Sequence, residues 1–99
     1  MEPAPHPNEF DRAVEDVLLG LSPGEVVTYG WVAAEAGYPG RHRSVGTFLA
    51  NRFQGPNWWL VVGSDRRLHA PDTIEQERRL RADGVAVEGG KVLGEVQRP

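Results

Sequence analysis

Apolar residues recur at helical spacing near the start of the chain. Between Asn8 and about Gly20 they lie three or four positions apart, at Phe10, Val14, Val17, Leu18 and Leu21. Asn8 is a residue type that caps helix N-termini, and Asp11 would fall in the first turn. The pattern predicts an amphipathic helix with one apolar face toward a core.

Two shorter helices are predicted next, joined by a turn. Thr28 is suited to cap a helix over residues 29–36, and Gly37 is suited to end it in the left-handed conformation. A further helix is predicted from Arg41 to about Asn51, with its apolar residues inward and its arginines outward. Two short helices around a glycine-containing turn make a helix-turn-helix pattern.

Extended structure is predicted at three places. Residues 26–27 suit a very short strand, and the aromatic and β-branched run at residues 58–62 is typical of a buried strand. On such a strand the neighbouring Trp58 and Trp59 would face opposite sides. Glycines at residues 89–90, flanked by valines, indicate a two-residue hairpin.

A fourth helix is predicted before that hairpin. Its capping box has two possible registers, Asp72 with Glu75 or Thr73 with Gln76, and Gly84 would close the helix. The order of elements predicts a small α+β winged helix-turn-helix domain over residues 8–94. Residues 1–7 are interpreted as a disordered leader and residues 95–99 as a C-terminal tail.

Composition narrows the chemistry. The 99 residues suit one domain with one core, and they include no cysteine, which excludes disulfides, thiolate metal ligands and thiol nucleophiles. His6, His42 and His69 lack metal-ligand spacing, so we expect no metal, and we also expect no cofactor. No basic leader precedes an apolar stretch, and no apolar run is long enough for a bilayer. We therefore expect a cytoplasmic protein that is monomeric and makes no membrane contact.

The net charge of −3 is unevenly distributed. Residues 1–35 contain seven acids and one base, whereas residues 36–64 contain no acid and three arginines, Arg41, Arg43 and Arg52. Salt limits the reach of the distant acids to about 10 Å. A local positive surface can therefore contact phosphates although the whole chain is acidic.

Several segments resemble one family in consistent order. The Pro-Gly-Glu-Val-Val-Thr-Tyr-Gly at residues 23–30, the Arg-Ser-Val-Gly at 43–46 and the Val-Val-Gly-Ser-Asp at 61–65 resemble the DNA-binding domain of O6-alkylguanine-DNA alkyltransferases. The Leu80 to Gly84 stretch resembles the end of a helix in that domain. The resemblance covers roughly residues 9–87, and it implies the alkyltransferase fold.

One departure from that family concerns its reactive Pro-Cys-His-Arg motif. Here the matching residues are Asn57-Trp58-Trp59-Leu60, so a tryptophan replaces the nucleophile. This substitution resembles the alkyltransferase-like subfamily. The resemblance implies a non-enzymatic sensor, with no catalytic residue, that binds O6-alkylguanine in double-stranded DNA and flags it for nucleotide excision repair proteins.

The resemblance also implies roles for individual residues. Arg43 matches an arginine that fills the gap left by a flipped base, Tyr29 matches a tyrosine beside the target phosphate, and small residues of the third helix would let it approach the minor groove. The predicted DNA-binding residues are Tyr29, Arg41, Arg43, Ser44, Gly46, Thr47 and Arg52. The predicted lesion pocket comprises Tyr29, Trp58, Trp59, Val61, Arg67 and His69.

Two other hypotheses remain open at this point. A winged-helix regulator would bind plain and alkylated DNA equally, and a protein-interaction module without a pocket would show no salt-sensitive DNA binding. Taken alone, the arginines can be solvated helix charges and the tryptophans core residues.

Overall fold

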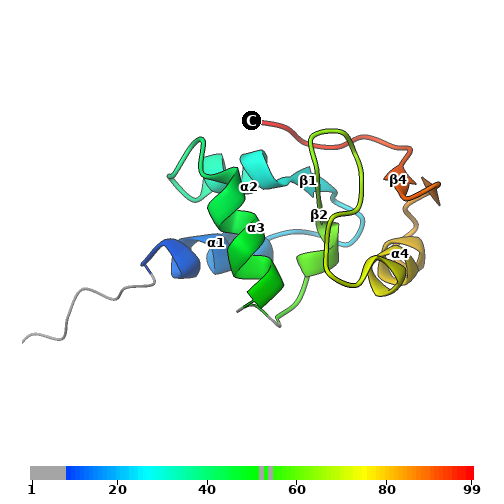
Figure 1. The fold of residues 1–99 in the computed structure, drawn as a ribbon, viewed down its shortest axis with the longest axis horizontal. Coiled ribbons are helices and arrows are strands. Elements are labelled where there is room, and N and C mark those ends of the chain that lie inside the picture. Colours follow the sequence, from blue (N-terminus) through cyan, green and yellow to red (C-terminus); the bar gives the residue numbers. More distant parts are fainter. Residues whose placement is uncertain (1–8, 52, 54) are drawn as a thin grey trace, which may run out of the picture.

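The computed structural model describes residues 9–51, 53 and 55–99, which form a small α+β domain (Figure 1). The predicted leader 1–7 and Arg52 lie outside the described residues. In chain order the elements are α1 (Glu9–Leu19), β1 (Val27–Thr28), α2 (Tyr29–Glu35), α3 (His42–Asn51), η1 (Trp58–Leu60), β2 (Val61–Val62), α4 (Thr73–Ala82), β3 (Val87–Glu88) and β4 (Lys91–Val92). None of the helices in this part of the chain is long and apolar enough to cross a membrane.

The predicted boundaries of α2 and α4 are confirmed by their caps, whereas Asn8, the predicted cap of the first helix, lies outside the described residues. Thr28 Oγ1 accepts a hydrogen bond from Trp31 N at 3.0 Å, and Asp72 Oδ1 accepts one from Glu75 N at 3.0 Å, which selects Asp72 as the cap of α4. Gly37 and Gly84 follow α2 and α4 with φ of +92° and +85°. Glycine adopts this conformation without strain, so both helices end where the sequence predicts.

The core lies between α1, α2 and α3 on one side and α4 on the other, with the short parallel pair β1 and β2 between them (Figure 1). Fully buried side chains come from every one of these elements: Val14, Leu18, Val27, Val32, Val45, Leu60, Val62 and Leu80. Each large aliphatic side chain contributes roughly 1.5–3 kcal/mol when it leaves water. The core therefore fixes the helix-turn-helix pair, α2 and α3, against the strands.

The prediction of a strand over residues 58–62 is only partly right. Trp58–Leu60 forms the 3-10 turn η1, and only Val61–Val62 is a strand, paired in parallel with Val27–Thr28. Asn57 starts the turn in the left-handed conformation, with φ of 71°. Its amide Nδ2 donates to the carbonyls of Leu18 at 2.8 Å and Leu21 at 3.2 Å. These bonds to the end of α1 bend the chain before the strand begins.

The segment after β4 returns to the centre of the fold and ends beside α2 (Figure 1). Gln97 pairs in parallel with Val27: Thr28 N donates to Gln97 O at 3.0 Å, and Gln97 N donates to Val26 O at 2.9 Å. Residues 95–99, predicted as a tail, thus reach β1 on the edge opposite β2. The hairpin predicted at residues 89–90 is present, since β3 and β4 pair antiparallel around two glycines with positive φ.

Candidate nucleic-acid interface

A cavity of about 790 Å³ opens between the helix-turn-helix pair and the loop that joins β2 to α4. Its lining includes Tyr29 and Gly30 at the start of α2, and His42, Arg43, Gly46 and Thr47 on α3. The opposite wall is made by the loop residues Gly63, Ser64, Asp65 and His69, together with Pro99. Pockets for small ligands commonly measure roughly 300–1,000 Å³, so the cavity is large enough for a nucleobase.

A second, narrower hollow adjoins this cavity, and we call it the recess. It measures about 30 Å³ and is lined by Tyr29, Gly46, Leu49, Ala50, Trp58, His69, Ala70 and Pro71. Tyr29, Gly46 and His69 border both hollows. The recess therefore continues the cavity toward Trp58, and it adds an apolar wall of indole, leucine and alanine.

Tyr29 sits where the two hollows meet. Burial raises the pKa of its phenol above the ordinary value of 10.0, so the hydroxyl stays protonated and can donate a hydrogen bond. Its ring lies against α3 at a glycine: a Cβ at Gly46 would be 3.8 Å from the nearest ring atoms. That distance is ordinary van der Waals contact, so a small residue here lets the ring and α3 pack together.

The arginines at the start of α3 and just before it are available to a ligand. Among the described residues, Arg41 and Arg43 are exposed and make no ion pair, and no carboxylate lies on α3 itself. The carboxylate on the cavity wall is Asp65, which accepts a hydrogen bond from Arg67 N at 3.0 Å and lies 3.3 Å from His69 Nε2. The hydrogen bond from the Arg67 backbone is the main reason why the pKa of Asp65 is lowered.

The structure brings together part of the predicted site. Tyr29, Arg43, Gly46, Thr47 and His69 line the cavity, and Trp58 lines the recess beside them. Arg41, which directly precedes α3, and Ser44 on α3 lie outside both linings, and Arg52 is not among the described residues. His42, to which the sequence analysis assigned no site role, borders the cavity because it occupies the first turn of α3.

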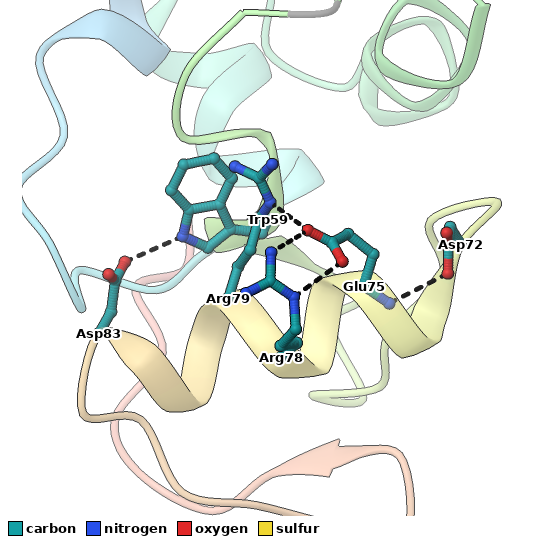
Figure 2. A network of polar contacts seen from close by, with 6 residues as sticks. All are labelled: Trp59, Asp72, Glu75, Arg78, Arg79 and Asp83. Atoms are coloured by element: carbon teal, nitrogen blue, oxygen red, sulfur yellow. Dashed lines mark hydrogen bonds and ion pairs between the residues drawn. The ribbon is translucent and has the colours of Figure 1, made fainter.

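Three predicted pocket residues lie elsewhere. Val61 is buried in the core beneath the site, and the exposed Arg67 lies 3.9 Å from Asp65 on the outside of the loop. Trp59 faces α4 instead of the hollows, where its Nε1 donates to Asp83 Oδ2 at 2.9 Å (Figure 2). The reason is η1: in a 3-10 turn, successive side chains point about 120° apart, so the two indoles do not simply alternate across a strand.

From the opposite wall of the cavity, only His69 was selected by the sequence analysis. Gly63, Ser64 and Asp65 belong to a segment that resembles the alkyltransferases, and that resemblance was the available signal. At Gly63, a Cβ would come within 2.5 Å of Asp65 Oδ1 and 2.6 Å of His69 Nε2, so the glycine makes room for these side chains. Pro99, which packs over Gly30, gave no signal in the sequence.

The site combines a positive helix, a neutral phenol and aromatic walls around a base-sized hollow. No group of three or more metal-ligating side chains occurs within the described part of the chain. The full sequence contains no cysteine. This arrangement can bind a ligand, because arginine can contact phosphates and a planar ring can lie against tyrosine and tryptophan.

Comparison with known proteins agrees with this reading. The family model for the 6-O-methylguanine DNA methyltransferase DNA-binding domain matches residues 9–85. A DNA base-flipping protein of Vibrio parahaemolyticus is 38% identical over 90 residues, covering 86% of this chain and 90% of that protein. Its namesake in Escherichia coli is 35% identical over 86 residues, covering 83% and 67%.

Solved structures are similar as well. S. pombe Atl1 in complex with damaged DNA containing O6-carboxymethylguanine superposes with a TM-score of 0.78 at 25% identity, covering 96% of this chain and 93% of that one. A second complex of the S. pombe protein with DNA gives a TM-score of 0.72 over the same share of each chain. The small α+β fold predicted from the sequence is therefore confirmed.

Proposed function

We propose that this chain, which belongs to the 6-O-methylguanine DNA methyltransferase DNA-binding domain family, is a DNA lesion sensor. It binds the minor groove of a duplex, holds a flipped O6-alkylguanine and performs no chemistry on it. The reversible complex then marks the lesion for nucleotide excision repair, and the sensor acts as a monomer in the cytoplasm.

One observation supports this proposal above the others. Arg43 and Trp58, 15 positions apart in sequence, border two hollows that meet at Tyr29. A helix whose cation lies at the mouth of an aromatic-walled cavity is the arrangement needed to open a base pair and shelter the extruded base. The names of the similar proteins, which speak of base flipping and of damaged DNA, agree with that use.

Each residue has a physical task in this proposal. Extruding a base costs a few kcal/mol, and the planar guanidinium of Arg43 offsets part of that cost by stacking in the vacated space. Tyr29 lies at the N-terminus of α2, where backbone N–H groups attract a phosphate. Gly46 and Thr47 present little bulk, so α3 can approach the minor groove closely.

The absence of cysteine makes the binding reversible. A thiolate would accept the alkyl group and end the encounter in a covalent bond, but an indole is not such a nucleophile. By its resemblance to the alkyltransferases, Trp58 takes the place of that thiol and offers the base an apolar wall. After incubation with methylated DNA, we expect every methyl group to remain on the DNA, and transfer to the protein would refute this part of the proposal.

A titration tests the binding itself. Duplexes that differ only in one O6-methylguanine are titrated with the protein at two salt concentrations. We expect tighter binding to the methylated duplex, and weaker binding to both duplexes at the higher salt concentration because phosphate contacts release counterions. Equal affinities would instead indicate a DNA-binding regulator without lesion preference. Absence of salt-dependent binding would indicate a protein-interaction module.

A further inference from the structure

Helix α4 lines neither hollow, but it contacts Trp58, which forms part of the wall of the recess. We propose that Asp83 and Arg79 are positioning residues that set the lesion preference of the recess by fixing Trp59 and, through it, Trp58. The proposal rests on the lesion-sensor function, because it explains how an aromatic wall keeps the orientation that stacking on a flipped base requires.

The contacts form a continuous stack. Trp59 Nε1 donates to Asp83 Oδ2 at 2.9 Å, and the guanidinium carbon of Arg79 lies 4.8 Å from the centroid of the Trp59 ring (Figure 2). The same carbon lies 5.9 Å from the Trp58 ring, and the two indoles meet edge to face at 87° with centroids 5.9 Å apart. Both indoles are thus held by one arginine.

Arg79 is itself held on α4. Its Nε donates to Glu75 Oε2 at 2.7 Å, one helical turn earlier, so the guanidinium is kept over the rings (Figure 2). Gln76, on the same helix, donates from Nε2 to the carbonyls of Trp59 at 3.2 Å and Val61 at 2.9 Å. The backbone of η1 and the side chain of Trp59 are therefore both attached to α4.

Helix stability does not explain Asp83. A carboxylate at the C-terminus of a helix faces the negative end of the helix dipole, which is the less favourable end for an acid. The hydrogen bond from Trp59 gives this carboxylate a partner there. We infer that the acid serves the indole and not α4.

The consequence concerns binding. Trp58 is only half-buried, so its ring gains rotational freedom when Trp59 is no longer fixed against it. The ring must lose that freedom again when a base binds. Ordering one such side chain on binding weakens affinity by about 3- to 10-fold. Under the proposal only the flipped, alkylated base reaches Trp58, so this loss falls on the lesion complex alone.

The decisive experiment compares Asp83→Ala with Asp83→Asn. Each variant is titrated with the O6-methylguanine duplex and the plain duplex, and its melting temperature is measured. Asp83→Ala should reduce the lesion-over-plain preference by about 3- to 10-fold and leave plain-duplex affinity unchanged. Asp83→Asn keeps an acceptor oxygen for Trp59 Nε1 and should restore the preference. If both variants behave as wild type, or if Asn fails as Ala does, the proposal is overturned.

Further variants test whether the loss of lesion preference reflects only a general structural effect. Trp59→Phe keeps a ring against Arg79 but has no N–H, so it should reproduce the loss of lesion preference seen with Asp83→Ala. The double variant Asp83→Ala/Trp59→Phe should lose no more of this preference than either single variant. Additive losses would overturn the proposal. Arg79→Met should also lower the lesion-over-plain preference, because it removes the cation that packs on both indoles. Arg78→Met is its matched control and should leave the preference unchanged, because Arg78 binds the same Glu75 but is 66% exposed. A wild-type protein without lesion preference would refute the lesion sensor itself, which is a different outcome.

Discussion

Helices α3 and α4 both contain arginines, but they use them in opposite ways. On α3, Arg43 lies at the cavity without an ion pair among the described residues. On α4, Arg78 and Arg79 bind Glu75, and Arg81 binds Glu77 at 3.0 Å. The α4 arginines outnumber that of α3, yet each of them is paired with a glutamate of the same helix.

The two helices therefore differ in the pairing of their arginines, and not in the number of cations, at the helix that lines the cavity. Carboxylates three or four residues before an arginine lie on the same helix surface and compensate its charge. Helix α3 has no acid at such a position, so the positive potential of Arg43 extends into the cavity. On α4, Arg79 instead packs against the tryptophan pair.

Destabilising the turn at Asn57, which lies between α3 and α4 in the chain, should have the largest effect. Asn57→Pro cannot adopt the φ of 71° and also loses the bonds to the carbonyls of Leu18 and Leu21. We expect the free energy of unfolding to fall by about 3 kcal/mol or more, measured by urea denaturation. Asn57→Gly is the control: it accepts the conformation and loses only the bonds, at about 1–2 kcal/mol. If the proline variant is as stable as the glycine variant, the turn does not depend on the left-handed residue.

Removing one unpaired cation should affect binding next most strongly. Arg43→Ala should weaken binding to the O6-methylguanine duplex by more than about 10-fold, because the extruded base leaves a gap that alanine cannot fill. The same change on α4, Arg78→Ala, should alter affinity less than about 2-fold, since that charge is already paired with Glu75. Equal losses in the two variants would contradict the contrast between the helices.

The smallest effect concerns pH. Hydrogen bonds from Arg78, and then from Arg79, lower the pKa of Glu75 from 4.5 to about 2. Because the folded-state pKa is lowered, this carboxylate stabilises the protein fully above about pH 4.5, and the contribution disappears as the pH falls through about 2. Wild type should therefore melt slightly above Glu75→Gln at pH 6, and the two melting temperatures should converge near pH 2. A difference independent of pH would mean that the pairing is not what stabilises α4.

The sequence predicted most of the local structure. The ends of α2 and α4 follow from Thr28, Asp72, Gly37 and Gly84, because caps and left-handed glycines act within a few residues of themselves. The helix-turn-helix order followed from apolar spacing, and the family followed from short motifs. For the site, Tyr29, Arg43 and Trp58 were predicted from the resemblance, and the structure brings them to adjoining hollows.

The sequence could not predict the different positions of the two tryptophans. Trp58 and Trp59 are the same residue type at adjacent positions, so composition and spacing cannot assign one to the recess and the other to α4. That assignment depends on Asn57, whose side chain reaches the end of α1 more than 35 positions away, and on Asp83, which lies 24 positions after Trp59. The residues alone determined the local helices, their caps and the lack of a thiol. Tertiary structure alone decided which indole borders the recess, because side-chain direction in a turn is set by distant partners that bend the backbone.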